Sequence, residues 1–361
     1  MRVLCLTNMW PTEAQPDYGA FVAAMCGALE ARGVAVEVAA IEARGGGPLR
    51  TPTKYGRLAA TAARRAHAAD VIYAHYLFPT GAIAAAAGGL AGTPWVLTAH
   101  GGDVANLSRG VVRAATDPGL RGASGIIAVS GYLAEEIAGA GVARGRIRVI
   151  NMGVDLERFA PRERGPARAR LGLPPDGEII LAVGGLTDRK NPLTLLQAVE
   201  RLRATRPGVR LALVGSGPLA AAVGRGAERL GLTDLVAPGA VPHDEVADWM
   251  AAADVLAMVS RVEPLGQVAL EALAVGRPVV ATAVGGAREV VPDHGPGRIV
   301  DPLDPARIAA ALDDVLARPP AAAECRAAAA PYALSQQAAR VESVLADACR
   351  SDGETTASGN T

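Results

Sequence analysis

Two glutamates, Glu263 and Glu271, lie eight positions apart in the segment EPLGQVALEALAVGRPVV, residues 263–280. The apolar run between them reads as the first turns of a helix, and the Gly-Arg-Pro turn after them leads into a Val-Val strand start. This order predicts a loop–helix–strand unit with one carboxylate in the loop and the other on the helix. A helix start attracts phosphate, and a carboxylate beside it accepts hydrogen bonds from hydroxyls. Phosphate together with hydroxyls describes a sugar nucleotide.

A second segment places cations beside a helix start. In VGGLTDRKNPLTLLQAV, Arg189 and Lys190 follow a predicted strand and precede a helix that begins near Pro192. The carboxyl ends of parallel strands open into the ligand crevice of such sheets. Two cations at that edge predict a diphosphate clamp. The alternative is a solvated charged turn.

Further polar groups follow predicted strands in the first half of the chain. His100, in TAHGGDV, follows an apolar strand and precedes a Gly pair and Asp103. Gly19, in PDYGAFVAAM, lets the backbone approach a phosphate at the start of a helix. His75 and Tyr76 follow another strand and either line a ligand pocket or pack in the core.

The segment LVGSGPLA, residues 213–220, matches a weaker pattern. It reads GxGxxA after a strand, and Asp234 lies about 20 residues further on, as in a dinucleotide fingerprint. Pro218 inside the motif and its position in mid-chain argue against that function. We interpret it as a tight turn in a nucleotide-binding domain, and keep a nicotinamide oxidoreductase as an alternative.

Composition bounds the remaining classes. The chain has 361 residues, enough for two domains, and 50% of them are hydrophobic but only 3% aromatic, so Ala, Val and Leu must build the core. The 36 basic residues balance 36 acidic ones, which argues against a nucleic-acid partner. The four cysteines, Cys5, Cys26, Cys325 and Cys349, show no CxxC spacing and favour a reduced compartment over a disulfide scaffold.

Targeting signals are not convincing. The run VLCL, residues 3–6, is too short for a signal peptide, and GAIAAAAGGLAG, residues 81–92, is shorter than the roughly 18 residues that span a bilayer. We therefore expect a cytoplasmic protein. The polar residues 350–361 predict a disordered tail.

Short apolar runs alternate with Ala-rich helical segments along the whole chain. Strands are predicted at 3–7, 36–41, 71–75, 94–100, 125–130 and 147–151, and again at 178–185, 210–215, 234–239, 254–260 and 277–282. Residues 160–177, rich in charge, Pro and Gly, read as a linker. We predict an α/β fold of two doubly wound domains, 1–163 and 164–332, facing a central cleft, with a helix at 333–349 that packs back on the first domain.

These segments together resemble the family 4 retaining glycosyltransferases (glycosyl transferases group 1) of the GT-B fold, over nearly the whole chain. The resemblance rests on the following segments: residues 98–104, 129–159, 183–191, 214–219 and 263–291. It implies two Rossmann-like domains, the first for the acceptor and the second for the nucleotide sugar. It also implies transfer from a nucleotide-diphosphate sugar, with a UDP- or GDP-sugar expected, and no obligatory metal or other cofactor.

The resemblance also implies roles for the polar groups. Glu263 would bind the hydroxyls of the transferred sugar, and Glu271 those of the ribose. Lys190 would neutralise the charge that develops on the departing phosphate, and His100 would lie under the donor sugar. The leaving phosphate takes the acceptor proton in such enzymes, so no protein general base is assigned.

Backbone amides complete the donor site that the resemblance implies, at Leu265, Gly266 and Gln267, with Gly19 and Arg189 as further donor-binding residues. Two positions depart from the family pattern. Gly185 stands where the family has Arg in a G-R-L triplet, and Leu265 stands where it has Phe. Either Arg189 replaces the missing guanidinium, or the clamp rests on Lys190 alone.

The acceptor side is assigned to the first domain, with His75, Tyr76 and Asp103 as candidate contacts. Residues 42–70 carry a basic stretch against only two acidic residues: Arg44, Arg50, Lys54, Arg57, Arg64 and Arg65. The stretch predicts an anionic acceptor or peripheral contact with an anionic membrane at its inner face, or else a solvated surface. The acceptor expected is a lipid-linked or cell-envelope glycan, or a natural product such as an aminocyclitol.

Two rival functions use the same fold. A sugar-nucleotide 2-epimerase needs acid and base groups in a different arrangement, and the paired glutamates and the Arg-Lys turn argue against it. A non-catalytic sugar-nucleotide-binding protein would not need Glu263, Lys190 and His100 together. The oligomeric state is not predicted by the sequence.

Overall fold

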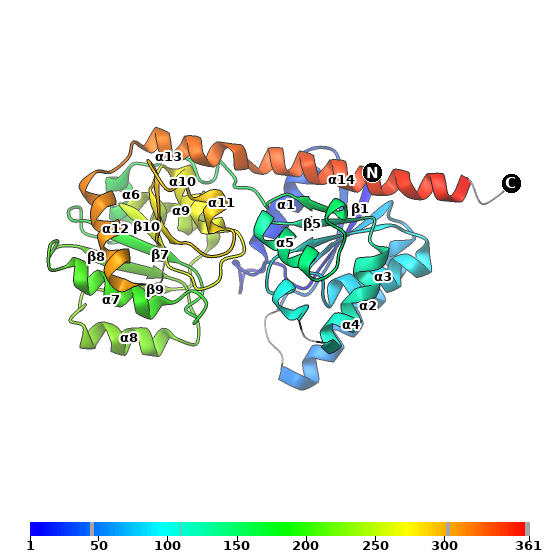
Figure 1. Ribbon diagram of the computed structural model, residues 1–361, viewed down its shortest axis with the longest axis horizontal. Coiled ribbons are helices and arrows are strands. Elements are labelled where there is room, and N and C mark those ends of the chain that lie inside the picture. The colour runs from blue at the N-terminus through cyan, green and yellow to red at the C-terminus, as the bar shows by residue number, and fades with distance from the viewer. Residues whose placement is uncertain (44–46, 109, 301–303, 358–361) are drawn as a thin grey trace. The chain divides into compact units, whose positions relative to one another are not determined.

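The computed structural model describes residues 1–43, 47–108, 110–300 and 304–357. Strands and helices alternate, and the strands form two six-stranded sheets (Figure 1). The chain divides into two compact units, each built around one sheet: Met1–Gly153 with Leu334–Thr361, and Val154–Ala333.

The first sheet is wholly parallel, in the order β2-β1-β3-β4-β5-β6. Its strands are β1 (Arg2–Thr7), β2 (Ala35–Ala40), β3 (Val71–His75), β4 (Trp95–Ala99), β5 (Gly125–Ala128) and β6 (Ile147–Val149). Every residue of β3 is buried, as expected for a central strand with helices on both faces. The helices of this unit are α1 (Ala20–Glu30), α2 (Gly47–Ala66), α3 (Thr80–Ala91), η1 (Val104–Asn106), α4 (Gly110–Gly122), α5 (Gly131–Gly139), η2 (Arg144–Arg146) and α14 (Leu334–Ala357).

The C-terminal helix α14 returns to the first unit and contacts α1, β3, β4 and β5 (Figure 1). Arg340 donates to the carbonyl of Val149 at 2.7 Å, and Arg32, in the turn just after α1, pairs with Glu342 at 2.5 Å. The helix runs to Ala357, whereas the sequence predicted a disordered tail from residue 350. Residues 358–361 of that tail lie outside the described part of the chain.

The second sheet is also parallel, in the order β12-β11-β10-β7-β8-β9. Its strands are β7 (Ile179–Val183), β8 (Arg210–Val214), β9 (Val236–Gly239), β10 (Val255–Met258), β11 (Val279–Thr282) and β12 (Gly297–Val300). Its helices are α6 (Arg164–Arg170), α7 (Pro192–Leu202), α8 (Ala220–Arg229), α9 (His243–Ala252), α10 (Gln267–Val275), α11 (Ala287–Val290), α12 (Pro305–Ala317), α13 (Ala322–Ala329) and η3 (Ala330–Tyr332). The predicted strands are all present, with ends shifted by up to two residues; the sequence analysis missed β12, whose GRIV segment has only two consecutive apolar residues.

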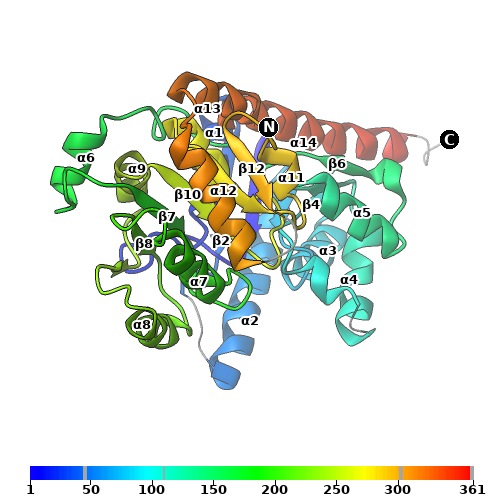
Figure 2. The same cartoon turned by 60° about the vertical axis from the view of Figure 1, so that its left-hand side comes forward.

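Aliphatic side chains form the core of the second unit. Figure 2 shows α7 and α12 side by side against the sheet, where Leu195, Leu196 and Val199 of α7 and Ile308 and Leu312 of α12 are almost completely buried. This core of Leu, Val, Ile and Ala agrees with the low aromatic content of the chain.

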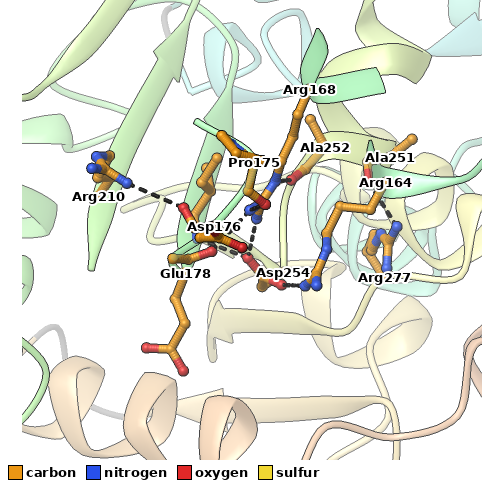
Figure 3. A network of polar contacts seen from close by, with 12 residues as sticks. Arg164, Arg168, Pro175, Asp176, Glu178, Arg210, Ala251, Ala252, Asp254 and Arg277 are labelled. Carbon is orange, nitrogen blue, oxygen red and sulfur yellow. Dashed lines mark hydrogen bonds and ion pairs between the residues drawn. The ribbon is translucent and has the colours of Figure 1, made fainter. Parts of the chain in front are cut away.

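The predicted linker is in fact part of the second unit. Arg168 of α6 is 1% exposed and donates to the carbonyls of Ala252, Pro175 and Gly177 at 2.9, 2.9 and 3.0 Å. Its guanidinium also pairs with Asp254 at 2.8 Å, and Figure 3 shows Arg164 reaching the same carboxylate. A buried charge needs such partners. The unit boundary consequently falls at 153/154 rather than at 163/164.

The sheet orders define where ligands are expected. The order in which successive strands are added reverses between β1 and β3 in the first sheet and between β7 and β10 in the second. Ligands of open α/β sheets bind outside the carboxyl ends of the strands at such switch points. In the second unit the loops concerned are 184–191 and 259–266, and in the first they are 8–19 and 76–79. Across the described residues, no helix has the length and apolar character needed to cross a membrane.

Candidate functional site

An ion pair joins the two loops at the switch point of the second sheet. Lys190, just before α7, places its Nζ atom 2.6 Å from Oε2 of Glu263, which follows β10. Ser260 donates its hydroxyl to the same Oε2 at 3.0 Å. Glu263 is only 5% exposed, so this carboxylate is held between the two loops.

The two oxygens of Glu263 have different environments. Oε2 accepts from both Lys190 and Ser260, whereas no hydrogen bond from the described residues goes to Oε1. One oxygen therefore fixes the orientation of the carboxylate, and the other is available to accept a hydrogen bond from a ligand hydroxyl.

Backbone packing fixes the start of α10. Gly266 is its N-cap with φ 103°, and a Cβ there would lie 3.0 Å from Met258 Cε and 3.1 Å from Val290 Cγ2. Gly286 donates its N–H to the carbonyl of Glu263 at 2.9 Å, and a Cβ at Gly286 would collide with the carbonyl of Pro264. The loop is thus held rigidly, with residues 265–267 at the helix end whose first N–H groups have no intrahelical acceptor.

Glu271 lies on α10, as the sequence predicted, and is 5% exposed. Its Oε1 is 3.6 Å from Nε2 of His243, and Nδ1 of the same ring is 2.9 Å from Nη1 of Arg158. A guanidinium only donates hydrogen bonds, so Nδ1 is the acceptor and the ring proton lies on Nε2, facing Glu271. His243 and Arg158 could not be predicted from the sequence, because neither stands at a recognisable spacing from the glutamates.

Arg189 has a different setting from Lys190. Its side chain is exposed, and within the described residues it has no ion pair or hydrogen bond. Its backbone carbonyl accepts from the N–H of Arg261 at 2.7 Å. The structure therefore brings Arg189 to the edge that carries Lys190 and Glu263 without fixing its guanidinium.

The glycines of GSGPLA allow two loops of the second unit to pack closely against each other. A Cβ at Gly215 would collide with the carbonyl of Gly184, and one at Gly217 with the carbonyl of Leu186. Asp234, the acidic residue that a dinucleotide fingerprint would place on a ribose, pairs instead with Arg203. The spacing of these residues is explained by packing inside the second unit.

Two histidines meet at the carboxyl edge of the first sheet. His75 Nδ1 and His100 Nε2 are 3.0 Å apart, and the two rings stack with centroids 5.3 Å apart. Tyr76 and Phe21 pack against the His100 ring at 4.8 and 5.0 Å. Burial lowers the pKa of His100 to about 3 although part of its surface is exposed, and burial followed by the neighbouring His100 lowers the pKa of His75. Both rings are therefore neutral at neutral pH.

Asp103 organises the loops around this pair. Its buried carboxylate accepts backbone N–H groups of Leu77, His100, Gly101 and Val104, at 2.8, 3.1, 2.8 and 3.1 Å. Burial raises the pKa of Asp103, and these donors oppose the rise.

The predicted acceptor contacts therefore occupy different depths. Asp103 faces the chain's own amides, and His75 is fully buried behind His100. Of the candidate acceptor contacts, Tyr76 is the side chain that is partly exposed.

Gly19 caps α1 with φ 81°. A Cβ there would lie 2.6 Å from the carbonyl oxygen of Met9, so the close approach that this glycine permits is to the backbone of its own loop. The structure thus gives a packing reason for Gly19 inside the first unit.

The basic stretch forms part of a pocket beside β2. This pocket, of about 380 Å³, lies between the end of β2 and α2, and its cationic lining residues are Lys54, Arg57 and Arg65. Arg65 is engaged with Glu37 at 3.0 Å, and Lys54 donates to the carbonyl of Ala43 at 2.9 Å. The side chains of Arg44 and Arg50 lie outside the described part of the structure. Elsewhere among the described residues, His, Cys, Asp and Glu form no group of three or more that would hold a metal.

Sequence comparisons agree with the two-unit division. Residues 19–158 match the family described as Glycosyltransferase Family 4, and residues 163–331 match Glycosyl transferases group 1. A D-inositol 3-phosphate glycosyltransferase from Frankia alni is 38% identical over 277 residues, which cover 69% of this chain and 66% of that protein. The corresponding protein from Streptosporangium roseum is 40% identical, over 58% of this chain and 51% of its own length. D-inositol 3-phosphate glycosyltransferase 1 from Catenulispora acidiphila is 35% identical, over 73% of this chain and 68% of its own length.

The chain thus spans between half and about two thirds of the length of these relatives. Among solved structures, Anabaena Alr3699/HepE in complex with UDP-glucose is similar with a TM-score of 0.77 and 24% identity, over 96% of this chain and all of that one. WaaG, a glycosyltransferase involved in lipopolysaccharide biosynthesis, has a TM-score of 0.72 and 20% identity, over 96% and 99% of the two chains. With both halves matched and both sheets in place, this chain belongs to the family 4 glycosyltransferases and has the GT-B fold.

Proposed function

We propose that this protein transfers a sugar from a nucleoside diphosphate sugar to an acceptor hydroxyl, with retention of anomeric configuration. The observation that carries the proposal is the Lys190–Glu263 pair at the switch point of the second sheet. It combines a cation for phosphate, a carboxylate oxygen available to a sugar hydroxyl, and the start of α10 beside them.

The donor is held by groups of the second unit in this proposal. Lys190 has three N–H donors, so it can keep its contact with Glu263 while it meets a phosphate oxygen. Glu263 Oε1 accepts from a hydroxyl of the sugar, and Glu271 accepts from the ribose. The amides at Leu265–Gln267 face the diphosphate or the sugar oxygens.

Transfer breaks the bond between the anomeric carbon and the phosphate oxygen and forms one to the acceptor oxygen on the same face. Negative charge develops on the leaving diphosphate, where Lys190 stabilises it electrostatically. The acceptor proton passes to a leaving phosphate oxygen. His100 is a poor rival for that proton, because a group with a pKa of about 3 is a weak base near pH 7.

We infer a uridine diphosphate sugar as donor, because the similar Anabaena structure holds UDP-glucose. We also infer that the acceptor is a polyol that carries an anionic group. The similar curated proteins are D-inositol 3-phosphate glycosyltransferases, and the pocket beside β2 is lined by three cations, Lys54, Arg57 and Arg65, and by one carboxylate, Glu42. Since Lys190 and the start of α10 supply positive charge for the diphosphate, we infer transfer without an obligatory metal.

The decisive test begins with binding. Thermal unfolding is measured with UDP, GDP, ADP and dTDP, and we expect UDP to raise the midpoint most, because a ligand of the folded state stabilises it. Transfer from UDP-glucose to inositol phosphates is then followed by mass spectrometry, with and without EDTA. Glu263→Ala should abolish transfer, whereas Glu200→Ala, on the exposed face of α7, should not. If no nucleotide stabilises the chain and no sugar is transferred, the proposal is wrong.

A further inference from the structure

The turn Gly184-Gly185-Leu186 carries no cation, although it has space for a side chain at Gly185. A Cβ at Gly185 would lie 3.6 Å from the carbonyl oxygen of Ser216 and 3.7 Å from Thr187 Cγ2, which are ordinary contact distances. Gly185 is exposed, and its φ lies outside the left-handed region. A small cavity of about 30 Å³ beside it is lined by Lys190 and Ser260 among others. The site therefore has room for a side chain at position 185. Because glycine has none, a guanidinium that binds the diphosphate has to come from another residue.

Arg261, in the loop after β10, is anchored to the loop that carries Lys190. Its backbone N–H donates to the carbonyl of Arg189 at 2.7 Å, and its Nη2 donates to Oδ1 of Asn191 at 3.1 Å. These two contacts cross 70 or more positions of sequence and reach the residues on either side of Lys190 in the chain, and the second holds the guanidinium at Asn191. Arg261 has no carboxylate partner among the described residues, and its remaining N–H donors are not engaged with them.

Asn191, which accepts the hydrogen bond from Arg261, is itself buried and conformationally restrained. It is 4% exposed, adopts φ 53°, and its Oδ1 also accepts from Thr194 at 2.8 Å. Its Nδ2 is buried without an acceptor in the described structure. A buried, unpaired donor and a left-handed backbone both cost free energy, and such costs gather at ligand sites.

The charges of the two loops favour an anion. The two loops carry three cations, Arg189, Lys190 and Arg261. They carry only two carboxylates, Asp188 and Glu263, and Glu263 is already paired with Lys190. Of the two arginines, Arg261 is fixed by Asn191 whereas Arg189 is not. A guanidinium that is already positioned loses less conformational entropy when it binds a ligand.

We propose that Arg261 is the second cation of the diphosphate site and takes over the function of the arginine absent at Gly185. The proposal rests on the proposed function, because it assigns a ligand group to the same donor site. Arg261 donates its free N–H groups to the phosphate farther from the nucleoside, while Lys190 serves the phosphate oxygens from the other loop.

Calorimetry with UDP and UMP on the full chain tests this assignment. Arg261→Ala should weaken UDP binding roughly tenfold or more and change UMP binding little, because the lost contact is to the second phosphate. Arg261→Lys should recover part of the loss. Arg225→Ala, an exposed arginine of α8, is the matched control and should bind both nucleotides as the wild type does.

A second-site variant makes the test specific. Adding Gly185→Arg to Arg261→Ala should restore UDP affinity, since it returns the guanidinium to the family position. The inference is overturned if Arg261→Ala binds UDP as tightly as wild type, or if Arg189→Ala loses more UDP affinity than Arg261→Ala does. Failure of the wild type to bind any nucleotide would instead overturn the proposed function together with this inference.

Discussion

Lys190 and Glu263 are 73 positions apart in the chain, and the Nζ and Oε2 atoms of their side chains lie 2.6 Å apart. The pair links the loops on either side of the switch point, so in the proposed function it positions both the cation that meets the phosphate and the carboxylate that meets a sugar hydroxyl. Because Glu263 is buried, the cation also serves stability. Catalytic and structural consequences of this pair can be separated by mutation.

Lys190→Ala is expected to lower the turnover number by about two to three orders of magnitude, since it removes a preorganised charge from the leaving group. It should also lower the free energy of unfolding by about 1–3 kcal/mol, because Glu263 is left without its cation. The double variant Lys190→Ala/Glu263→Ala should regain part of that stability and remain inactive. Steady-state kinetics and urea unfolding check both effects. Turnover of Lys190→Ala near that of the wild type would disprove the role of the lysine.

The contact of His243 with Glu271 gives a prediction about the ribose. If Nε2–H of His243 orients the carboxylate of Glu271, His243→Ala should reduce the preference for UDP over 2′-deoxy-UDP, which we expect to be about tenfold in the wild type. Arg158 keeps its ion pair with Asp244 in that variant, so its charge stays partnered. Calorimetry with both nucleotides measures the ratio of affinities.

His243→Gln retains an N–H donor and should restore part of the preference for UDP. His294→Ala, which changes an exposed histidine, is the matched control. An unchanged affinity ratio in His243→Ala would show that Glu271 keeps its position without the imidazole.

Much of the fold was predictable because its central strands, such as β3 and β10, are buried on both faces. Continuous apolar runs such as VIYA and IILAV then mark central strands, and the Pro-Leu-Gly turn before Gln267 marks the start of α10. The predicted loop position of Glu263 and helical position of Glu271 are both confirmed. Strand β12, which pairs with β11, was not predicted, because its Gly and Arg interrupt the apolar pattern of a buried strand.

Partners that lie far apart in sequence were not predictable. Arg158 meets His243 across 85 positions, and Arg168 meets Asp254 across 86, so no local spacing reveals either contact. A stretch of Arg, Pro and Gly has the composition of a linker whether or not one arginine is buried. Only the tertiary structure shows that Arg168 is buried.

The buried histidine pair predicts a dependence of stability on pH. The folded chain keeps His75 and His100 neutral, because the pKa of each lies below the value of about 6.5 found in an unfolded chain. As pH falls from about 6.5 towards 3, the unfolded state binds protons that the folded state does not, so the free energy of unfolding decreases. Each such group contributes a slope of about 1.4 kcal/mol per pH unit.

His75→Asn should reduce the slope of the unfolding free energy with pH by the share of about one proton. The asparagine amide can occupy the place of Nδ1 but does not titrate. Urea unfolding between pH 7 and pH 5 measures the slope for wild type and variant. His67→Asn, at an exposed position, should leave the slope unchanged. Equal slopes for wild type and His75→Asn would mean that His75 is protonated in the folded chain.

Arg168 predicts how firmly α6 is attached to the second unit. Its guanidinium satisfies three carbonyls and the carboxylate of Asp254, which also accepts the N–H of Ile179 at 2.8 Å (Figure 3). Arg168→Ala leaves these acceptors buried and should lower the free energy of unfolding by about 3–5 kcal/mol. Arg170→Ala, two positions on, removes a 2.7 Å pair with Asp248 from an arginine that is 52% exposed, and should lower the free energy of unfolding far less, because solvent screens an exposed pair. Urea unfolding of both variants decides the point: similar losses would mean that α6 is held by its surface contacts, as a linker would be.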